Sequence, residues 1–138
     1  MNPDFPIEDK VHEYYWNDDI NCATTLMKTV SEILDIELSQ QVIDSAVGMH
    51  GAGKFGAQCG LVEGSLMLIG IIGRKKKLSD EMNVKHCYRF AEEFQKKFGS
   101  LNCSTLRPEG FKPENSPHLC EKLTVKAIEF TSGFINEI

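Results

Sequence analysis

Apolar side chains recur at intervals of three and four residues along most of this chain, the spacing that places them on one face of an α-helix. The pattern predicts a short amphipathic helical stretch near residues 7–15 and a short segment at residues 101–106. Another short helix is predicted over residues 38–47, and longer helices over residues 20–34, 58–73, 79–99 and 116–136. We therefore expect an all-α fold, a single-domain bundle of about five to six helices over residues 1–138.

Residues that favour helix ends accompany these segments. The run Asn-Asp-Asp at residues 17–19 supplies N-cap candidates for the helix that follows it. Ser39 and Ser79 stand before two further helices. Ser116 and Pro117 form a typical pair of N-cap and first-turn residues for the last helix. The predicted starts of these four helices therefore have a local chemical reason.

One apolar segment is ambiguous by periodicity alone. Residues 65–72 could form a buried strand, but the length of the segment and the lack of an alternating partner elsewhere favour a buried central helix after the glycine-rich loop 48–59. Gly56, Gly60 and Gly64 recur every four residues there and leave one face almost without side chains. Another backbone or a cofactor could approach that face closely, so these three glycines are candidate cofactor-binding residues.

Charge and composition narrow the class of protein. The net charge of -5 argues against a nucleic-acid partner, because binding phosphates requires a basic surface. The longest apolar stretch, residues 61–72, contains Glu63 and is too short to span a bilayer. The acidic first residues show no secretory signal. We expect a cytoplasmic protein without membrane insertion, where five cysteines point to metal binding, redox chemistry or core packing rather than to structural disulfides.

Four of the five cysteines lie near breaks between predicted helices. Cys22, Cys59 and Cys120 fall in or near predicted first turns, and Cys103 lies in the short segment after residue 100. The positive end of a helix dipole favours the thiolate, which is the form that reacts or binds a metal. Cys59 is therefore the best candidate for a nucleophile of lowered pKa. Cys87 lies on an apolar stripe and is expected to be an inert core residue.

Other motifs are weaker. The chain has no CxxC pair, so the familiar zinc-ribbon and ferredoxin spacings are absent, although one ligand from each of four elements could still meet at one centre. Residues 48–54 fit part of a phosphate-binding loop, but Phe55 stands where that motif requires a hydroxyl, which argues against nucleotide binding. Among the histidines, His118 is the one closest to a candidate cysteine, Cys120.

Taken together in order, these features resemble a known family of redox-active proteins, named for its C–GCAxxG–C–C cysteine pattern. The resemblance covers about residues 20–130 and rests on Asn21-Cys22-Ala23, on Cys59-Gly60 with Gly64, on Phe98-Gly99-Ser100 before Cys103, and on Cys120. One departure is Leu61, where the family has alanine. The resemblance implies an all-helical fold and a redox role for the four cysteines. A similar domain accompanies some multihaem cytochromes and is associated there with an iron–sulfur centre.

Two classes of function stay open at this point. In the first, Cys22, Cys59, Cys103 and Cys120 act together, either as thiol–disulfide pairs of an oxidoreductase or as ligands of an iron–sulfur cluster that passes electrons. Such a protein would have a protein redox partner and could form a homodimer. In the second, the chain is a non-catalytic helical interaction module whose cysteines bind structural zinc or are simply packed.

Overall fold

The computed structural model describes residues 2–138, which form eight α-helices and no β-strand. Five helices have ten or more residues: α1 (Ile7–Trp16), α2 (Cys22–Leu34), α5 (Gly60–Lys75), α6 (Asp80–Phe98) and α8 (Glu121–Glu137). The three short ones are α3 (Gln40–Ser45), α4 (Gly51–Lys54) and α7 (Cys103–Leu106). The predicted all-α bundle is confirmed. Over the same residues, no helix is both long enough and apolar enough to cross a membrane.

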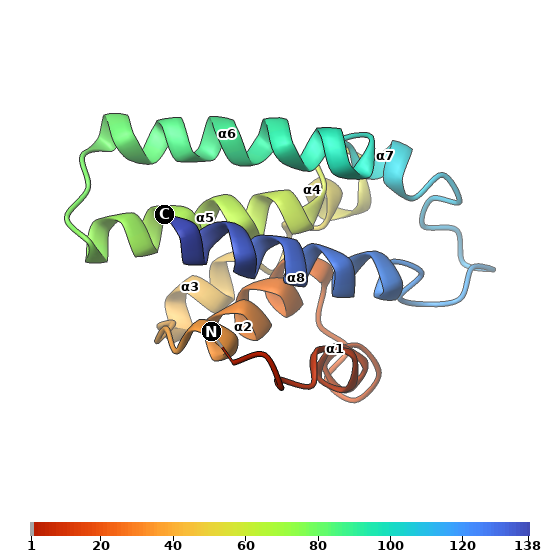
Figure 1. The fold of residues 1–138 in the computed structure, drawn as a ribbon. Helices are drawn as coiled ribbons and strands as arrows, with labels where there is room; N and C mark the ends of the chain where they lie inside the picture. The colour runs from red at the N-terminus through yellow and green to blue at the C-terminus, as the bar shows by residue number, and fades with distance from the viewer. Residues whose placement is uncertain (1) are drawn as a thin grey trace.

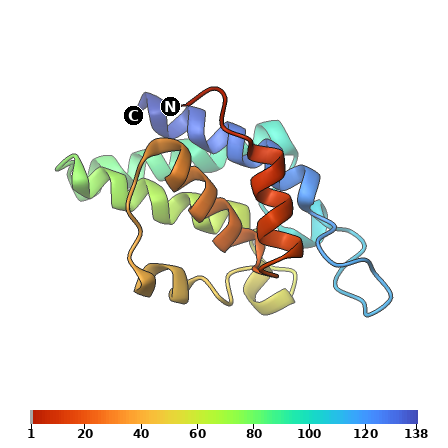
Figure 2. The same cartoon turned by 90° about the horizontal axis from the view of Figure 1, so that it is seen from below.

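Helix α2 lies at the centre of the bundle. It packs against α1, α5 and α8, while α6 packs on the other side of α5 (Figure 1). Helix α1 crosses α8, as the view from below shows (Figure 2). The N-terminal ends of α5 and α8 lie at the same end of the bundle as the short helices α4 and α7 (Figure 1). That end is where the candidate site residues meet.

The ambiguous apolar segment is a helix, α5, buried on most of its faces. Leu61, Val62, Leu68 and Ile69 are all fully buried, so the segment shows no clean polar stripe. A helix that is apolar nearly all round has no helical periodicity to read, which is why the pattern alone did not separate it from a strand. The prediction of a helix here, which rested on the length of the segment, is confirmed.

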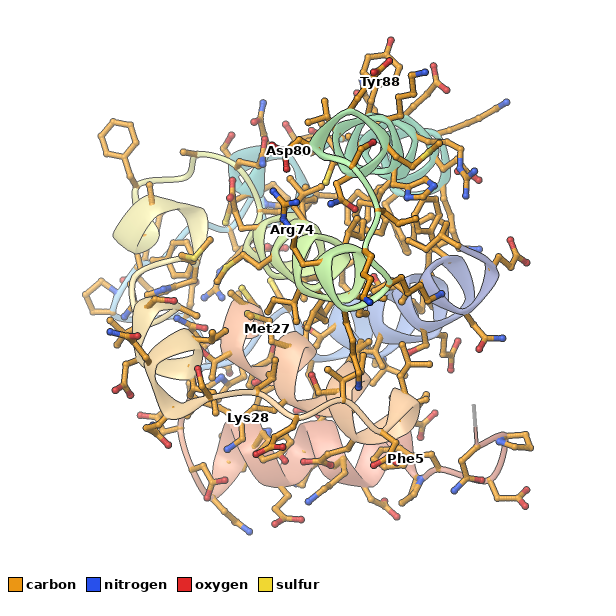
Figure 3. The ribbon with its side chains drawn as sticks, turned by 90° about the vertical axis from the view of Figure 1, so that its left-hand side faces the viewer. Phe5, Met27, Lys28, Arg74, Asp80 and Tyr88 are labelled. Atoms are coloured by element: carbon orange, nitrogen blue, oxygen red, sulfur yellow. The ribbon has the colours of Figure 1, made fainter. Side chains whose placement is uncertain are left out.

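The glycine face of α5 is occupied by α2. A Cβ at Gly64 would lie 3.0 Å from the carbonyl oxygen of Ala23 and 3.0 Å from Cγ of Met27. Met27 accordingly lies between the two helices, whereas Tyr88 projects outward from α6 (Figure 3). The spacing of the glycines thus allows two backbones to approach closely.

Phenylalanine rings join α6 to α8. Ring centroids lie 4.6–6.5 Å apart, the range for favourable aromatic pairs, among Phe90, Phe94, Phe98, Phe130 and Phe134. The apolar spacing of residues 79–99 predicts a buried stripe of Val84, Cys87, Ala91, Phe94 and Phe98 on α6. This prediction is wrong at its start, because Val84 is 66% exposed and Asn83 and Phe90 face inward instead. The packing of the phenylalanine rings decides which face of α6 is buried.

Two predicted N-caps are correct and two are wrong. Ser39 and Ser79 cap α3 and α6, as predicted. Helix α2 starts later than residues 17–19, and its N-cap is Asn21. Helix α8 does not start at residues 116–117, because His118 has a φ of 61° that interrupts helical geometry. Both errors concern long connections in which several residues could cap a helix and tertiary contacts choose one.

Candidate functional site

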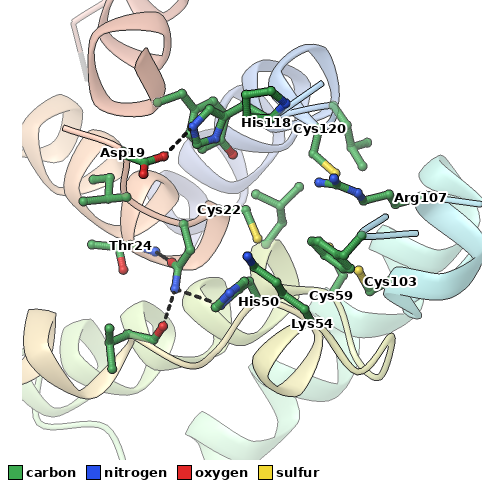
Figure 4. A pocket seen from close by; sticks show the side chains of 18 of the residues that line it. Asp19, Cys22, Thr24, His50, Lys54, Cys59, Cys103, Arg107, His118 and Cys120 are labelled. Atoms are coloured by element: carbon green, nitrogen blue, oxygen red, sulfur yellow. Dashed lines mark hydrogen bonds and ion pairs between the residues drawn. The ribbon is translucent and has the colours of Figure 1, made fainter. Parts of the chain in front are cut away.

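All four candidate cysteines line one pocket. Its volume is about 730 Å³, within the usual range for a ligand site, and we call it the four-cysteine pocket. Cys22, Cys59, Cys103 and Cys120 reach it from four different segments of the chain (Figure 4). Residues as far apart in sequence as Cys22 and Cys120 therefore meet at one site.

Each of these cysteines stands at the beginning of a helix. Cys22 and Cys103 are the first residues of α2 and α7, and Cys59 and Cys120 are the N-cap residues of α5 and α8. Sequence analysis placed three cysteines near first turns, and the structure adds Cys103. The dipoles of α2, α5 and α8, each of 13 residues or more, favour negative charge at this end of the bundle.

Backbone hydrogen bonds fix Cys59 beside Cys103. The N–H of Cys59 donates to the carbonyl of Leu101 at 2.8 Å, and the N–H of Cys103 donates to the carbonyl of Ala57 at 2.7 Å. These two bonds flank an isolated antiparallel bridge between Gln58 and Asn102. Two loops that are distant in the chain are thereby held in register, and each carries one thiol into the pocket.

The candidate glycines lie around the pocket rather than along its lining. A Cβ at Gly60 would approach Sγ of Cys22 to 2.6 Å, so the missing side chain makes room for that sulfur. Gly64 faces α2, and Gly56 has a φ of 97° in the loop before Cys59. Leu61, which replaces the family alanine, is fully buried and contributes to the pocket wall.

The free thiols are hard to ionise. Burial raises the pKa of Cys59 to about 12, although the backbone N–H groups of Leu61 and Val62 act in the opposite direction. Burial and then the neighbouring thiols raise the pKa of Cys22 as well, and burial raises the pKa values of Cys103 and Cys120. The expectation of a lowered pKa at Cys59 is therefore wrong for the free thiol, because loss of hydration outweighs the helix N-terminus.

These shifts predict that the reduced, metal-free chain loses stability in alkaline solution. Above pH about 8.5 the thiols of the unfolded chain ionise while the buried thiols stay protonated. The folded chain then binds more protons, and its free energy of unfolding falls by up to about 1.4 kcal/mol per pH unit for each thiol. Melting curves between pH 7.5 and 9.5 measure this fall, and Cys59→Ala should make it shallower. An unchanged slope in that variant would contradict the assignment.

Two cations that sequence analysis did not select also line the four-cysteine pocket. Lys54 comes from α4 and Arg107 follows α7 (Figure 4). Burial, followed by the charges of Lys54 and Arg107, lowers the pKa of His50, which lies in the same wall. No local signal marks Arg107, which stands at the start of a proline-containing loop. Lys54 is marked in the sequence only by the incomplete phosphate-loop motif of residues 48–54.

His118 lines the pocket and is fixed from two sides. Its Nε2 lies 2.9 Å from Oδ1 of Asp19, and its ring stacks on Tyr15 with centroids 4.5 Å apart. These contacts connect the turn before Cys120 to the connection between α1 and α2. The structure thus gives His118 a packing role in holding the segment that carries Cys120.

Asn21 links the start of α2 to the loop on the opposite side of the pocket. Its Oδ1 accepts from the N–H of Thr24 at 2.8 Å, and its Nδ2 donates to the carbonyls of Ala46 and Val47 at 2.9 and 3.0 Å. The same amide lies 3.1 Å from Nδ1 of His50. One side chain therefore caps the helix that begins with the adjacent Cys22 and anchors the facing loop.

Asn21→Ala is expected to lower the free energy of unfolding by about 2–4 kcal/mol. Loss of an N-cap costs about 1 kcal/mol, and each lost hydrogen bond adds about 0.5–1.5 kcal/mol. Asn21→Asp keeps the cap but lacks the amide donors, so its free energy of unfolding should lie between those of Asn21→Ala and the unmodified chain. Urea unfolding measures the series, and equal stability of Asn21→Ala and the unmodified chain would contradict this account.

The thiols are not arranged around a single point. Within residues 2–138, no group of three or more His, Cys, Asp or Glu side chains is placed so that it could hold one metal ion. None of the described cysteines is in a disulfide. The four cysteines therefore line a shared pocket, but their sulfurs are not close enough together to bind one ion.

Comparison with known proteins agrees with the cysteine pattern. Neither the curated proteins nor the solved structures gave a match. The model of one protein family, described as "Putative redox-active protein (C_GCAxxG_C_C)", matches residues 20–134. The matched region contains all four cysteines of the pocket and most of the bundle. The chain therefore belongs to the C_GCAxxG_C_C family of redox-active proteins.

Proposed function

We propose that this protein is an electron-transfer protein in which Cys22, Cys59, Cys103 and Cys120 hold an iron–sulfur cluster. The observation that carries the proposal is that four thiols from four segments line one pocket. Four cysteine thiolates are the usual ligand set of [2Fe–2S] and [4Fe–4S] clusters. When bound, such a cluster supplies one-electron redox chemistry, and the chain holds and shields it.

The raised thiol pKa values support a ligand role over a nucleophilic one. A thiol that attacks a disulfide must be ionised near neutral pH, but burial keeps the pKa of Cys59 at about 12. A metal centre, by contrast, deprotonates coordinating thiols through its own positive charge. Buried thiols that stay protonated when free can therefore still serve as ligands.

The placement of the sulfurs supports a cluster over a single zinc ion. Tetrahedral zinc with Zn–S bonds of about 2.3 Å requires sulfurs roughly 3.8 Å from one another. The described side chains include no such ready group for one ion, whereas a centre of several irons is larger and its ligands stand farther apart. The pocket volume of about 730 Å³ is consistent with an occupant of that kind.

The surface beside the pocket supports a protein redox partner. Val47 lines the pocket and Phe55 follows Lys54 directly, and both apolar side chains are strongly exposed, Phe55 by 88%. Exposed apolar groups near a site commonly mark a contact surface. We propose that the electron partner approaches the four-cysteine pocket from this side.

Metal and sulfide analysis of protein purified without oxygen, or reconstituted with ferrous iron and sulfide, tests the proposal. The expected result is about two or more irons per chain, an equal amount of acid-labile sulfide, and visible absorption that bleaches on reduction. Stoichiometric zinc without sulfide would replace the proposal with a structural module. A metal-free chain that forms and breaks disulfides reversibly would replace it with thiol–disulfide exchange.

A further inference from the structure

The positive charges of the four-cysteine pocket lack carboxylate partners. Lys54 and Arg107 line the pocket, and neither forms an ion pair with a carboxylate in the part of the chain that the structure describes. The acidic residues in the same lining bond to other side chains. Asp19 pairs with His118 at 2.9 Å, and Asp44 accepts from the Gln40 amide at 2.8 Å. Lys54 and Arg107 are therefore cations of this pocket that no carboxylate pairs with directly, while Asp19 and Asp44 in the lining, and Glu109 through its effect on Cys120, bring negative charge to its surroundings.

Arg107 is held in place by its own loop. Its Nε donates to the carbonyl of Gly110 at 2.7 Å, and its guanidinium lies over the ring of Phe111, 4.0 Å from the centroid. The remaining nitrogens of the fork are directed toward the pocket beside Cys120 (Figure 4). A cation fixed in this way interacts with a charge in the pocket without a large loss of side-chain entropy.

Lys54 brings a second charge to the same space from the opposite loop. His50 lies in the pocket wall, and the charges of Lys54 and Arg107 both contribute, after burial, to lowering its pKa. The two cations therefore act on one region. Lys54 itself is exposed and has a φ of 72° in the short helix α4. Its charge is therefore more strongly screened by solvent than that of the half-buried Arg107.

We infer that Lys54 and Arg107 are the counter-charges of the redox centre and favour its reduced state. The inference rests on the proposed function. Four thiolates bring more negative charge than an oxidised cluster core brings positive charge, so the loaded pocket is a net anion, and an added electron makes it more negative. Nearby cations stabilise the more negative state more strongly. Arg107 has the larger effect because it is less exposed and better fixed.

Reduction potentials of the reconstituted variants test this role. Arg107→Gln should lower the equilibrium constant for one-electron reduction about tenfold, a fall in potential of about 59 mV. Lys54→Gln should lower the potential less, by an amount that shrinks as salt is added. Arg107→Lys should keep most of the native potential. Lys112→Gln removes an equal charge from an exposed residue of the same loop outside the pocket lining, and should leave the potential unchanged.

A second measurement uses the metal-free chain with sulfate as the probe. Sulfate should raise the melting temperature of the unmodified chain and of Lys112→Gln more than that of Arg107→Gln or Lys54→Gln. The Lys112 variant accounts for the general stabilising effect of sulfate on proteins. The comparison reports whether the pocket attracts anions in the absence of iron.

The outcomes separate the two proposals. Normal iron and sulfide content with equal potentials in Arg107→Gln and the unmodified chain overturns the counter-charge role alone. A potential that falls equally in Arg107→Lys and Arg107→Gln also overturns it, since the fork's packing rather than its charge would then matter. Failure of the unmodified chain to bind iron overturns the proposed function and this inference with it. The inference is supported if the reduction potential falls in Arg107→Gln and Lys54→Gln, stays unchanged in Lys112→Gln and is largely kept in Arg107→Lys.

Discussion

Alanine in place of Cys59 is expected to abolish stoichiometric iron and sulfide binding in the reconstituted protein. Cys59 is 4% exposed and is held by the hydrogen bond from its N–H to Leu101, so no other side chain takes its position in the pocket. Loss of a direct ligand should exceed the roughly 10–100-fold loss of affinity that follows from disturbing groups behind the ligands. Iron and sulfide assays with absorption spectra measure the change.

Cys87→Ala is the matched control for that experiment. Cys87 lies on α6, packs against the edge of the hydrophobic core and does not line the four-cysteine pocket. It should keep full iron and sulfide content with an unchanged visible spectrum. Circular dichroism should show native helix content in both variants. Full iron binding by folded Cys59→Ala would remove Cys59 from the ligand set, and loss of iron in Cys87→Ala would show that the pocket assignment is wrong.

Gly60→Ala is expected to destabilise the fold by about 1–3 kcal/mol and to weaken iron binding at the same time. The new Cβ would lie 2.4 Å from the carbonyl oxygen of Met49, 2.6 Å from Sγ of Cys22 and 3.2 Å from the backbone nitrogen of Ala23. Two of these atoms belong to the backbone and cannot swing aside, so both α2 and the loop at Met49 must move away from α5. The displaced sulfur of Cys22 links the loss of stability to the loss of metal affinity.

Gly70→Ala tests whether that effect is local. Gly70 lies in the interior of the same helix α5, and a Cβ there would meet no atom within 4 Å. Alanine at this position should stabilise the protein by about 0.5–1 kcal/mol because it favours the helix. Thermal unfolding of the two variants should therefore shift in opposite directions. Equal shifts would mean that helix propensity alone, and not the approach of α2, governs this face.

The thiol positions were largely predictable because helix ends are local features. Sequence patterns indicated that Cys22, Cys59 and Cys120 lie near first turns, and the structure places all three at the first residue or the N-cap of a helix. The exact caps are less predictable, since residues 17–19 are as suitable by type as Asn21, the residue that caps α2. Several polar residues there could cap a helix, and the bonds from Asn21 to the loop at Ala46 and Val47 decide between them.

The all-α class, most of the helices and the set of four cysteines can be read from the amino-acid sequence alone, because helical periodicity and end signals act over a few neighbouring residues. That the four thiols share a pocket, and that Arg107 and Lys54 line it with them, follows only from the packing of distant segments. That packing also reversed the expected direction of the Cys59 pKa, from lowered to raised. Desolvation and charge interactions depend on which distant segments pack together, and that information is not contained in any local stretch of sequence.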